Sequence, residues 1–131
     1  MRVLVACECS GRTRNAFAAL GHEAWSCDLL PAEDGPTPFH YQDSFENVLC
    51  KTVERWDLII AHPPCDYLAN CGARWRAERG EWAEMKEAAE FFMWCLEAPI
   101  CPVAVENPVM NRKRSGIRAC DFSIQPWQLL K

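Results

Sequence analysis

Long apolar runs are missing from this chain of 131 residues. No stretch approaches the roughly 20 apolar residues that a membrane-spanning helix needs. The apolar run at residues 3–6 follows a single arginine and is soon interrupted by Glu8, so it is too short for a secretory signal peptide. We therefore expect a cytoplasmic protein with reduced thiols and no membrane partner.

A surplus of positive charge is also missing. Lys and Arg together number 14, Asp and Glu number 18, and the formal net charge is −4. Compact nucleic-acid-binding proteins usually carry a basic surplus that neutralises phosphates. Any contact of this chain with DNA must therefore come from local patches or from a partner.

Cysteine pairs with metal-binding spacing are the third absence. The chain has nine cysteines, yet no two of them are spaced as CxxC. This argues against a zinc ribbon or a thioredoxin-type redox site, and we predict no metal site. Cys7 and Cys9 have no matching second pair, so their pattern favours packing over metal binding. Most of the cysteines are expected to be small core residues.

Alternating strand and helix patterns define the fold class. Half of the residues (50%) are hydrophobic, which suffices for a core, and the length suits a single domain, 1–131. A continuous apolar, β-rich run predicts a strand that is buried on both faces at 3–6, and 56–61 is the clearest buried strand after it. The same reading predicts further strands at 22–27, 39–42 and 102–105, and helices at 12–20, 45–54 and 81–96. The sequence therefore predicts an α/β fold of Rossmann type with a mostly parallel sheet.

Chemically capable residues follow three of the predicted strands. A short turn with one glycine occupies 7–11, Cys65 follows two prolines, and Glu106 precedes Asn-Pro. The carboxyl ends of parallel strands line one crevice, so Cys65 and Glu106 are expected to face each other across one site. Asp28, at the end of the second predicted strand, is expected on the same rim.

These strand ends resemble a known family. The stretches VLVACECSG (3–11), WSCD (25–28), DLIIAHPPC (57–65) and AVENP (104–108) are similar, in the same order, to the DNA cytosine methyltransferases that modify ring carbon 5. The closest resemblance is to the short phage-encoded members. It implies an S-adenosylmethionine-dependent methyltransferase fold, truncated in its C-terminal half and without a target-recognition domain. A phage-encoded protein would work in the host cytoplasm.

The resemblance also implies residue roles. Cys65 would be the nucleophile that adds to ring carbon 6 of a cytosine in DNA, and Glu106 would hold the ring nitrogen and the exocyclic amine. Asp28 would accept hydrogen bonds from the ribose of the cofactor S-adenosylmethionine. The implied cofactor-binding set is Cys7, Glu8, Ser10, Gly11, Asp28 and Pro63.

Other interpretations stay open at this level. Cys65 could simply pack under the Pro-Pro turn, and Glu106 and Asp28 could be ordinary caps. The chain could also be a catalytically inactive, methyltransferase-like protein that binds and inhibits a host nucleic-acid enzyme, such as a restriction or CRISPR effector. The net charge of −4 favours this second hypothesis, and the paired Pro-Pro-Cys and Glu-Asn-Pro motifs favour the enzyme.

Overall fold

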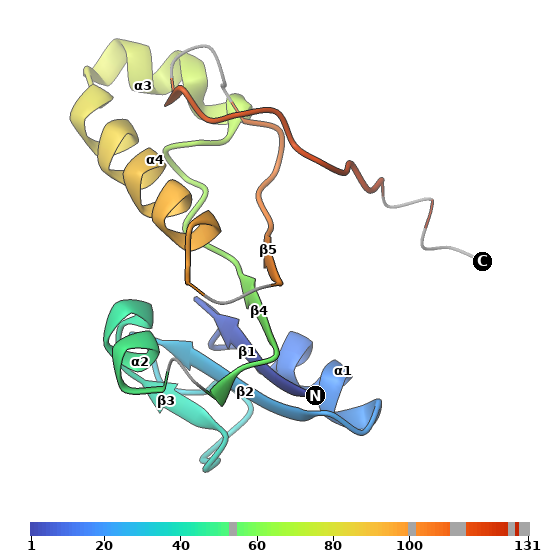
Figure 1. Ribbon diagram of the computed structural model, residues 1–131. Coiled ribbons are helices and arrows are strands. Elements are labelled where there is room, and N and C mark those ends of the chain that lie inside the picture. Colours follow the sequence, from blue (N-terminus) through green and yellow to red (C-terminus); the bar gives the residue numbers. More distant parts are fainter. Residues whose placement is uncertain (53–54, 100–101, 111–114, 126–127, 129–131) are drawn as a thin grey trace.

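The computed structural model describes residues 1–52, 55–99, 102–110, 115–125 and 128. Its strands form a five-stranded sheet, parallel throughout, in the order β3-β2-β1-β4-β5 (Figure 1). The strands are β1 (Arg2–Ala6), β2 (Glu23–Asp28), β3 (His40–Gln42), β4 (Leu58–Ala61) and β5 (Val103–Val105). The α-helices are α1 (Arg12–Ala19), α2 (Phe45–Thr52), α3 (Ala73–Arg79) and α4 (Trp82–Leu96). The predicted α/β fold with a parallel sheet is confirmed.

Strand β1 lies at the centre of the sheet. All four residues from Val3 to Ala6 are 0% exposed. Val5 pairs with Ser26 of β2 on one side and with Ile60 of β4 on the other. After β1, the next two strands, β2 and β3, are added on one side of β1, and β4 then pairs with the other side of β1. The strand order therefore reverses between β1 and β4, the place where open parallel sheets bind ligands.

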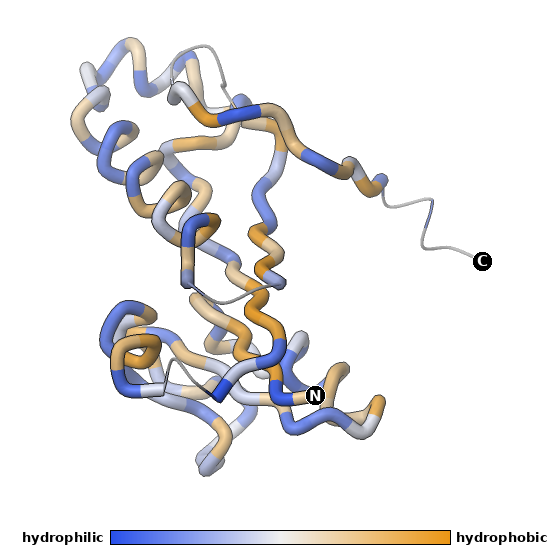
Figure 2. The backbone as a smooth tube through the Cα atoms, viewed as in Figure 1, coloured by the Kyte–Doolittle hydropathy of each residue, from blue (hydrophilic) through white to orange (hydrophobic). Residues whose placement is uncertain are grey.

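Different helices cover the two faces of the sheet. Val3 and Val5 pack with Ala24 in a cluster that Phe17 of α1 adjoins. Leu4 alternates to the other face, because successive side chains of a strand point to opposite sides. There it joins a larger cluster that includes Phe45, Val48 and Leu49 of α2 and Cys95 of α4. Burial on both faces explains why β1 is apolar without interruption, and hydrophobic colour runs along the strands in Figure 2.

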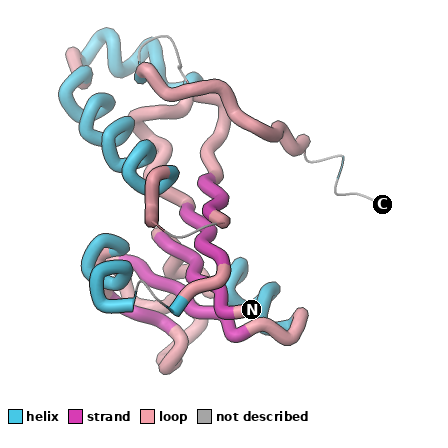
Figure 3. The backbone as a smooth tube through the Cα atoms, viewed as in Figure 1, coloured by secondary structure: helices cyan, strands magenta, loops and turns pink. Residues whose placement is uncertain are grey.

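Helix α4 connects the sheet to a second, smaller cluster. Its last turns reach the sheet, and its beginning lies beside α3 (Figure 1). Figure 3 shows helix and loop in that upper part, with the strands gathered below. The second cluster consists of Leu68, Met85, Ala89, Phe92 and Ile117. Met85, Ala89 and Phe92 are residues whose spacing predicted this helix.

Among the described residues, the predicted and observed ends of the elements agree to within one residue except at the start of β4. Strand β4 begins at Leu58, two residues later than expected, because Trp56 turns toward α2 instead of continuing the strand. The Trp56 indole is buried and its Nε1 donates a hydrogen bond to Thr52 Oγ1 at 2.8 Å. The last two residues of the predicted second helix, 53–54, lie outside the described residues.

The expectation that most cysteines are core residues is wrong. Among the described cysteines only two are buried, Cys27 and Cys95. The remaining ones are exposed or half-buried: Cys50, Cys71 and Cys120, and Cys7, Cys9 and Cys65. Cys50 is an exposed residue of α2, Cys71 lies in a 3-10 helix (Asn70–Gly72) and Cys120 lies in a loop. Cys101 is outside the described residues.

No helix in the described part of the chain is long and apolar enough to cross a bilayer.

Candidate functional site

A cavity of about 350 Å³ opens at the carboxyl edge of the sheet. Four strands contribute to it, since Cys7 follows β1, Asp28 ends β2, Asp43 follows β3 and Pro64 follows β4. The complete lining is Cys7, Cys27, Asp28, Leu29, Asp43, Ser44, Phe45, Glu46, Pro64 and Phe91. The volume lies within the range of small-molecule sites, about 300–1,000 Å³.

Three carboxylates make one part of this cavity acidic: Asp28, Asp43 and Glu46. Asp43 accepts hydrogen bonds from Asn47 Nδ2 at 2.9 Å, Lys51 Nζ at 3.0 Å and its neighbour Ser44 N at 2.8 Å. These bonds lower the pKa of Asp43 to about 2, so it stays ionised. Apart from Ser44, the rest of the lining is apolar or cysteine. The cavity therefore suits a ligand that combines an apolar part with hydrogen-bond donors or positive charge.

The turn after β1 contributes little more than Cys7 to the cavity. Glu8 is buried and its Oε1 accepts a 2.6 Å hydrogen bond from Ser10 Oγ. Gly11 has φ of 73°, a left-handed conformation that favours glycine, and a Cβ there would collide with the Asp34 carboxylate. Asp34 is itself held by Asn15 Nδ2 at 2.9 Å. The turn is thus packed by its own side chains and by the loop after β2.

The predicted cofactor residues therefore divide into two groups. Cys7 and Asp28 line the cavity. The other four are absent from its lining: Glu8, Ser10, Gly11 and Pro63. Glu8 Oε2 is buried and has no hydrogen-bond partner in the described part of the chain. Such an atom is costly to leave unpaired and marks Glu8 as an acceptor that lacks its donor.

Strands β4 and β5 bring the predicted catalytic segments to the same edge. Glu106 N donates to Ala61 O at 3.0 Å, which continues the ladder beyond both strands. His62 Nδ1 lies 3.6 Å from Glu106 Oε2. The Glu106 side chain is 63% exposed, and Cys65, three residues after His62, is half-buried. The Pro-Pro-Cys segment and Glu106 therefore follow the adjacent ends of two paired strands.

Unpaired polar atoms gather at this strand end. His62 Nε2 and both amide atoms of Asn107 are buried and have no hydrogen-bond partner among the residues that the structure describes. Buried polar groups normally find partners, and each exception requires an explanation. A polar ligand at the end of β4 and β5 would supply them.

Sequence reasoning missed most of the cavity wall. Asp43 had a local signal, because it directly follows a short predicted strand and precedes a helix. Glu46 and Phe91 had none, since each looks like an ordinary helix residue. Phe91 reaches the cavity only because α4 packs on the sheet beside α2.

The described residues hold no group of three or more His, Cys, Asp or Glu side chains arranged for a metal ion.

The fold and the edge cavity define a class: an α/β protein with a parallel, Rossmann-like sheet and a cavity at the carboxyl edge of that sheet. Comparison with protein-family models, with curated proteins and with solved structures finds no match to this chain.

The thiol of Cys7 is expected to resist alkylation. Burial, with the charges of Asp28 and Glu46, raises its pKa to about 12, so it stays protonated at neutral pH. Because only the thiolate is nucleophilic, iodoacetamide at pH 8 should modify Cys7 about tenfold or more slowly than the exposed Cys50. Peptide mass spectrometry over a time course measures both rates, and equal rates would contradict the buried environment of Cys7.

Proposed function

We propose that this protein is an S-adenosylmethionine-dependent methyltransferase that methylates carbon 5 of cytosine in DNA through a covalent cysteine adduct. One observation carries the proposal: the acidic and apolar cavity opens at the same sheet edge from which the Cys65 and Glu106 segments start. The sequence resemblance assigns these same strand ends to the cofactor and to the base.

The cavity fits the proposed cofactor in charge and shape. Asp28, Asp43 and Glu46 suit a ligand that carries a sulfonium, an amino group and ribose hydroxyls. Phe45 and Phe91 offer apolar contact to a purine ring. When bound, S-adenosylmethionine supplies an electrophilic methyl group. Asp28 would accept hydrogen bonds from the ribose hydroxyls, and Cys7 would border the ligand.

Cys65 and Glu106 act on the cytosine. Carbon 5 is a poor nucleophile until a thiolate adds to carbon 6 of the ring. Cys65 Sγ would pass its proton to solvent and bond to carbon 6, while the electron pair of the ring double bond moves to carbon 5. Glu106 would hold the ring nitrogen and the exocyclic amine, which favours this electron-rich adduct. Once carbon 5 carries the methyl group, solvent would take the proton from carbon 5, the ring double bond would re-form, and the bond from sulfur to carbon 6 would break with its electrons on Cys65 Sγ.

The base must leave the duplex before Cys65 can reach it. Extruding a paired base costs a few kcal/mol, which protein contacts must offset. The net charge of −4 gives no general attraction to DNA, so those contacts must be local.

Two measurements test the proposed function together. Calorimetry should detect binding of S-adenosylhomocysteine, and the tritiated cofactor should label unmethylated DNA in the presence of the protein. Binding without transfer would contradict the enzyme and favour an inactive, methyltransferase-like binding protein. Absence of any cofactor binding would contradict the enzyme and favour a protein that acts only by binding a partner.

Replacing Asp28 with asparagine is expected to weaken S-adenosylmethionine binding. The substitution keeps the size of the side chain and removes its charge. Charge-assisted hydrogen bonds contribute about 1.5–3 kcal/mol, so the Kd should rise about 10- to 100-fold. The matched control is Asp57→Asn, since Asp57 accepts a bond from Arg2 N at the opposite, amino edge of the sheet. Titration calorimetry measures both, and an unchanged Kd for Asp28→Asn would remove Asp28 from the site.

A further inference from the structure

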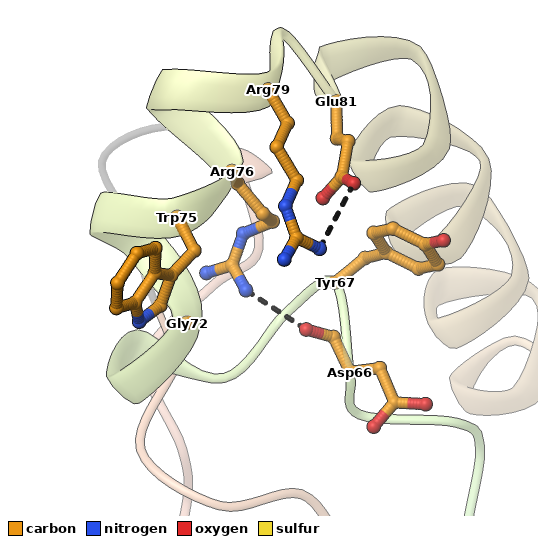
Figure 4. A pocket seen from close by; sticks show the side chains of 7 residues that line it. All are labelled: Asp66, Tyr67, Gly72, Trp75, Arg76, Arg79 and Glu81. Carbon is orange, nitrogen blue, oxygen red and sulfur yellow. Dashed lines mark hydrogen bonds and ion pairs between the residues drawn. The ribbon is translucent and has the colours of Figure 1, made fainter.

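Arg76 of α3 is a buried cation without an acidic partner. The residue is 3% exposed. No carboxylate of the described chain lies within ion-pairing distance of its guanidinium. Its guanidinium instead donates to two backbone carbonyls, Asp66 O at 2.8 Å and Ala69 O at 2.5 Å (Figure 4 draws the first). Burying a charge is unfavourable unless hydrogen bonds compensate for the lost water. This arrangement therefore depends on the two carbonyls.

Those carbonyls belong to the segment that directly follows Cys65. Leu68 N and Ala69 N both donate to Cys65 O, at 3.0 and 2.8 Å. The guanidinium thus closes a short chain of bonds, from Arg76 through Ala69 to the Cys65 backbone.

The same peptide meets the segment that follows Glu106. Ala69 forms an antiparallel bridge with Met110, and Asn70 N donates to Val109 O at 2.7 Å. Residues 109–110 come directly after Glu-Asn-Pro. One buried cation therefore holds the peptide at which the two proposed catalytic segments join.

Gly72 makes room for this cation. A Cβ at Gly72 would lie 2.5 Å from Arg76 Nη1 and 3.6 Å from Asp66 O. A cavity of about 210 Å³ lies alongside, lined in part by Trp75 and Arg79 (Figure 4). Arg79 is 67% exposed and pairs with Glu81, so it shares the helix and the cavity with Arg76 but not its backbone bonds.

We propose that Arg76 is a positioning residue that fixes the Cys65 segment against the Glu106 segment. A side chain of this kind acts on geometry and not on cofactor affinity. The kinetic part of this role rests on the proposed methyl transfer, whereas the effect on the Cys65 thiol does not.

The first test measures the thiol alone. In Arg76→Met the bonds to Asp66 O and Ala69 O are lost, so the Cys65 turn should loosen. Iodoacetamide should then modify Cys65 about threefold or more faster than in the wild type, with Cys50 and Cys120 unchanged, by peptide mass spectrometry. Arg79→Met is the matched control and should leave all three rates as they are. An unchanged Cys65 rate in a folded Arg76→Met protein would overturn the proposal.

The second test separates positioning from general stability. Arg76→Met should lower kcat for methyl transfer about 10- to 100-fold, while the KM for S-adenosylmethionine stays near the wild-type value. Arg76→Lys keeps the charge but has a single donor nitrogen, so its kcat should lie between those of Arg76→Met and the wild type. Equal loss in Arg76→Met and Arg79→Met, or a change confined to KM, would contradict the role.

Gly72→Ala provides a variant that keeps the charge. Its Cβ displaces the guanidinium, so it should accelerate Cys65 alkylation in the same direction as Arg76→Met. This variant decides the matter if Arg76→Met does not fold, and a wild-type alkylation rate in Gly72→Ala would then overturn the proposal. If the wild-type protein transfers no methyl group, the proposed function fails, and the alkylation rates still decide whether Arg76 positions Cys65.

Discussion

Replacing Cys65 with serine is expected to lower methyl transfer to DNA about 1,000-fold or more. A hydroxyl is a far weaker nucleophile than a thiolate, so the bond to carbon 6 does not form and carbon 5 is not activated. The cofactor should still bind, because Cys65 is not among the residues that line the acidic cavity. Tritium transfer measures the rate, and calorimetry with S-adenosylhomocysteine measures the binding.

Covalent trapping gives this prediction a second readout. In a 5-fluorocytosine oligonucleotide, fluorine replaces the hydrogen on carbon 5. Fluorine cannot leave as a cation after methylation, so with S-adenosylmethionine present the wild-type protein should remain attached through Cys65, as a band of increased mass under denaturing conditions. Cys65→Ser should form no such band. Cys50→Ser is the matched control, since Cys50 is exposed on α2 and away from the cavity lining. Methyl transfer by Cys65→Ser at the wild-type rate would exclude the covalent mechanism.

Leu4→Ala is expected to have the largest effect on stability. Leu4 is 0% exposed in the central strand and belongs to the main core cluster. Truncating a buried leucine removes apolar contact and leaves a cavity, which costs about 2–5 kcal/mol. Domains of this size are typically stable by about 5–15 kcal/mol, so this variant should lie near the limit of folding.

The same substitution at an exposed leucine is the control. Leu20 is 73% exposed just after α1, so Leu20→Ala should change the free energy of unfolding by less than about 0.5 kcal/mol. Urea denaturation followed by tryptophan fluorescence compares the two variants with the wild type. Equal midpoints for Leu4→Ala and Leu20→Ala would mean that β1 is not at the centre of the core.

Binding of a ligand in the edge cavity should partly offset the loss of stability in Leu4→Ala. Strand β1 carries Cys7 at its end and pairs with both β2 and β4, which deliver Asp28 and Pro64. A ligand that binds only the folded state stabilises it by mass action. Saturating S-adenosylhomocysteine should therefore raise the urea midpoint of Leu4→Ala if the cavity is the cofactor site.

The local sequence predicts a helix or strand well where its hydrophobic pattern and its tertiary packing favour the same structure. The run of Val3 to Ala6 suits a doubly buried strand, and the structure confirms it. The prediction for strand β4 is too long, because the indole of Trp56 packs toward α2 and donates a hydrogen bond to Thr52. The prediction for the cysteines fails for a related reason. Their small size permits burial, but whether a cysteine is buried depends on which other segments pack against it.

The sequence by itself determined which residues end strands, because an apolar run followed by Gly, Pro or acidic residues is a local signal. That signal is enough to place Cys65, Glu106, Asp28 and the turn from Cys7 to Gly11 at strand ends. Only the tertiary structure decided which of those ends are neighbours, since strand order depends on contacts between distant segments. It also decided that Glu46 and Phe91 line the cavity and that Arg76 is buried against Asp66 and Ala69. Those roles come from helix packing, and no periodicity in the chain encodes them.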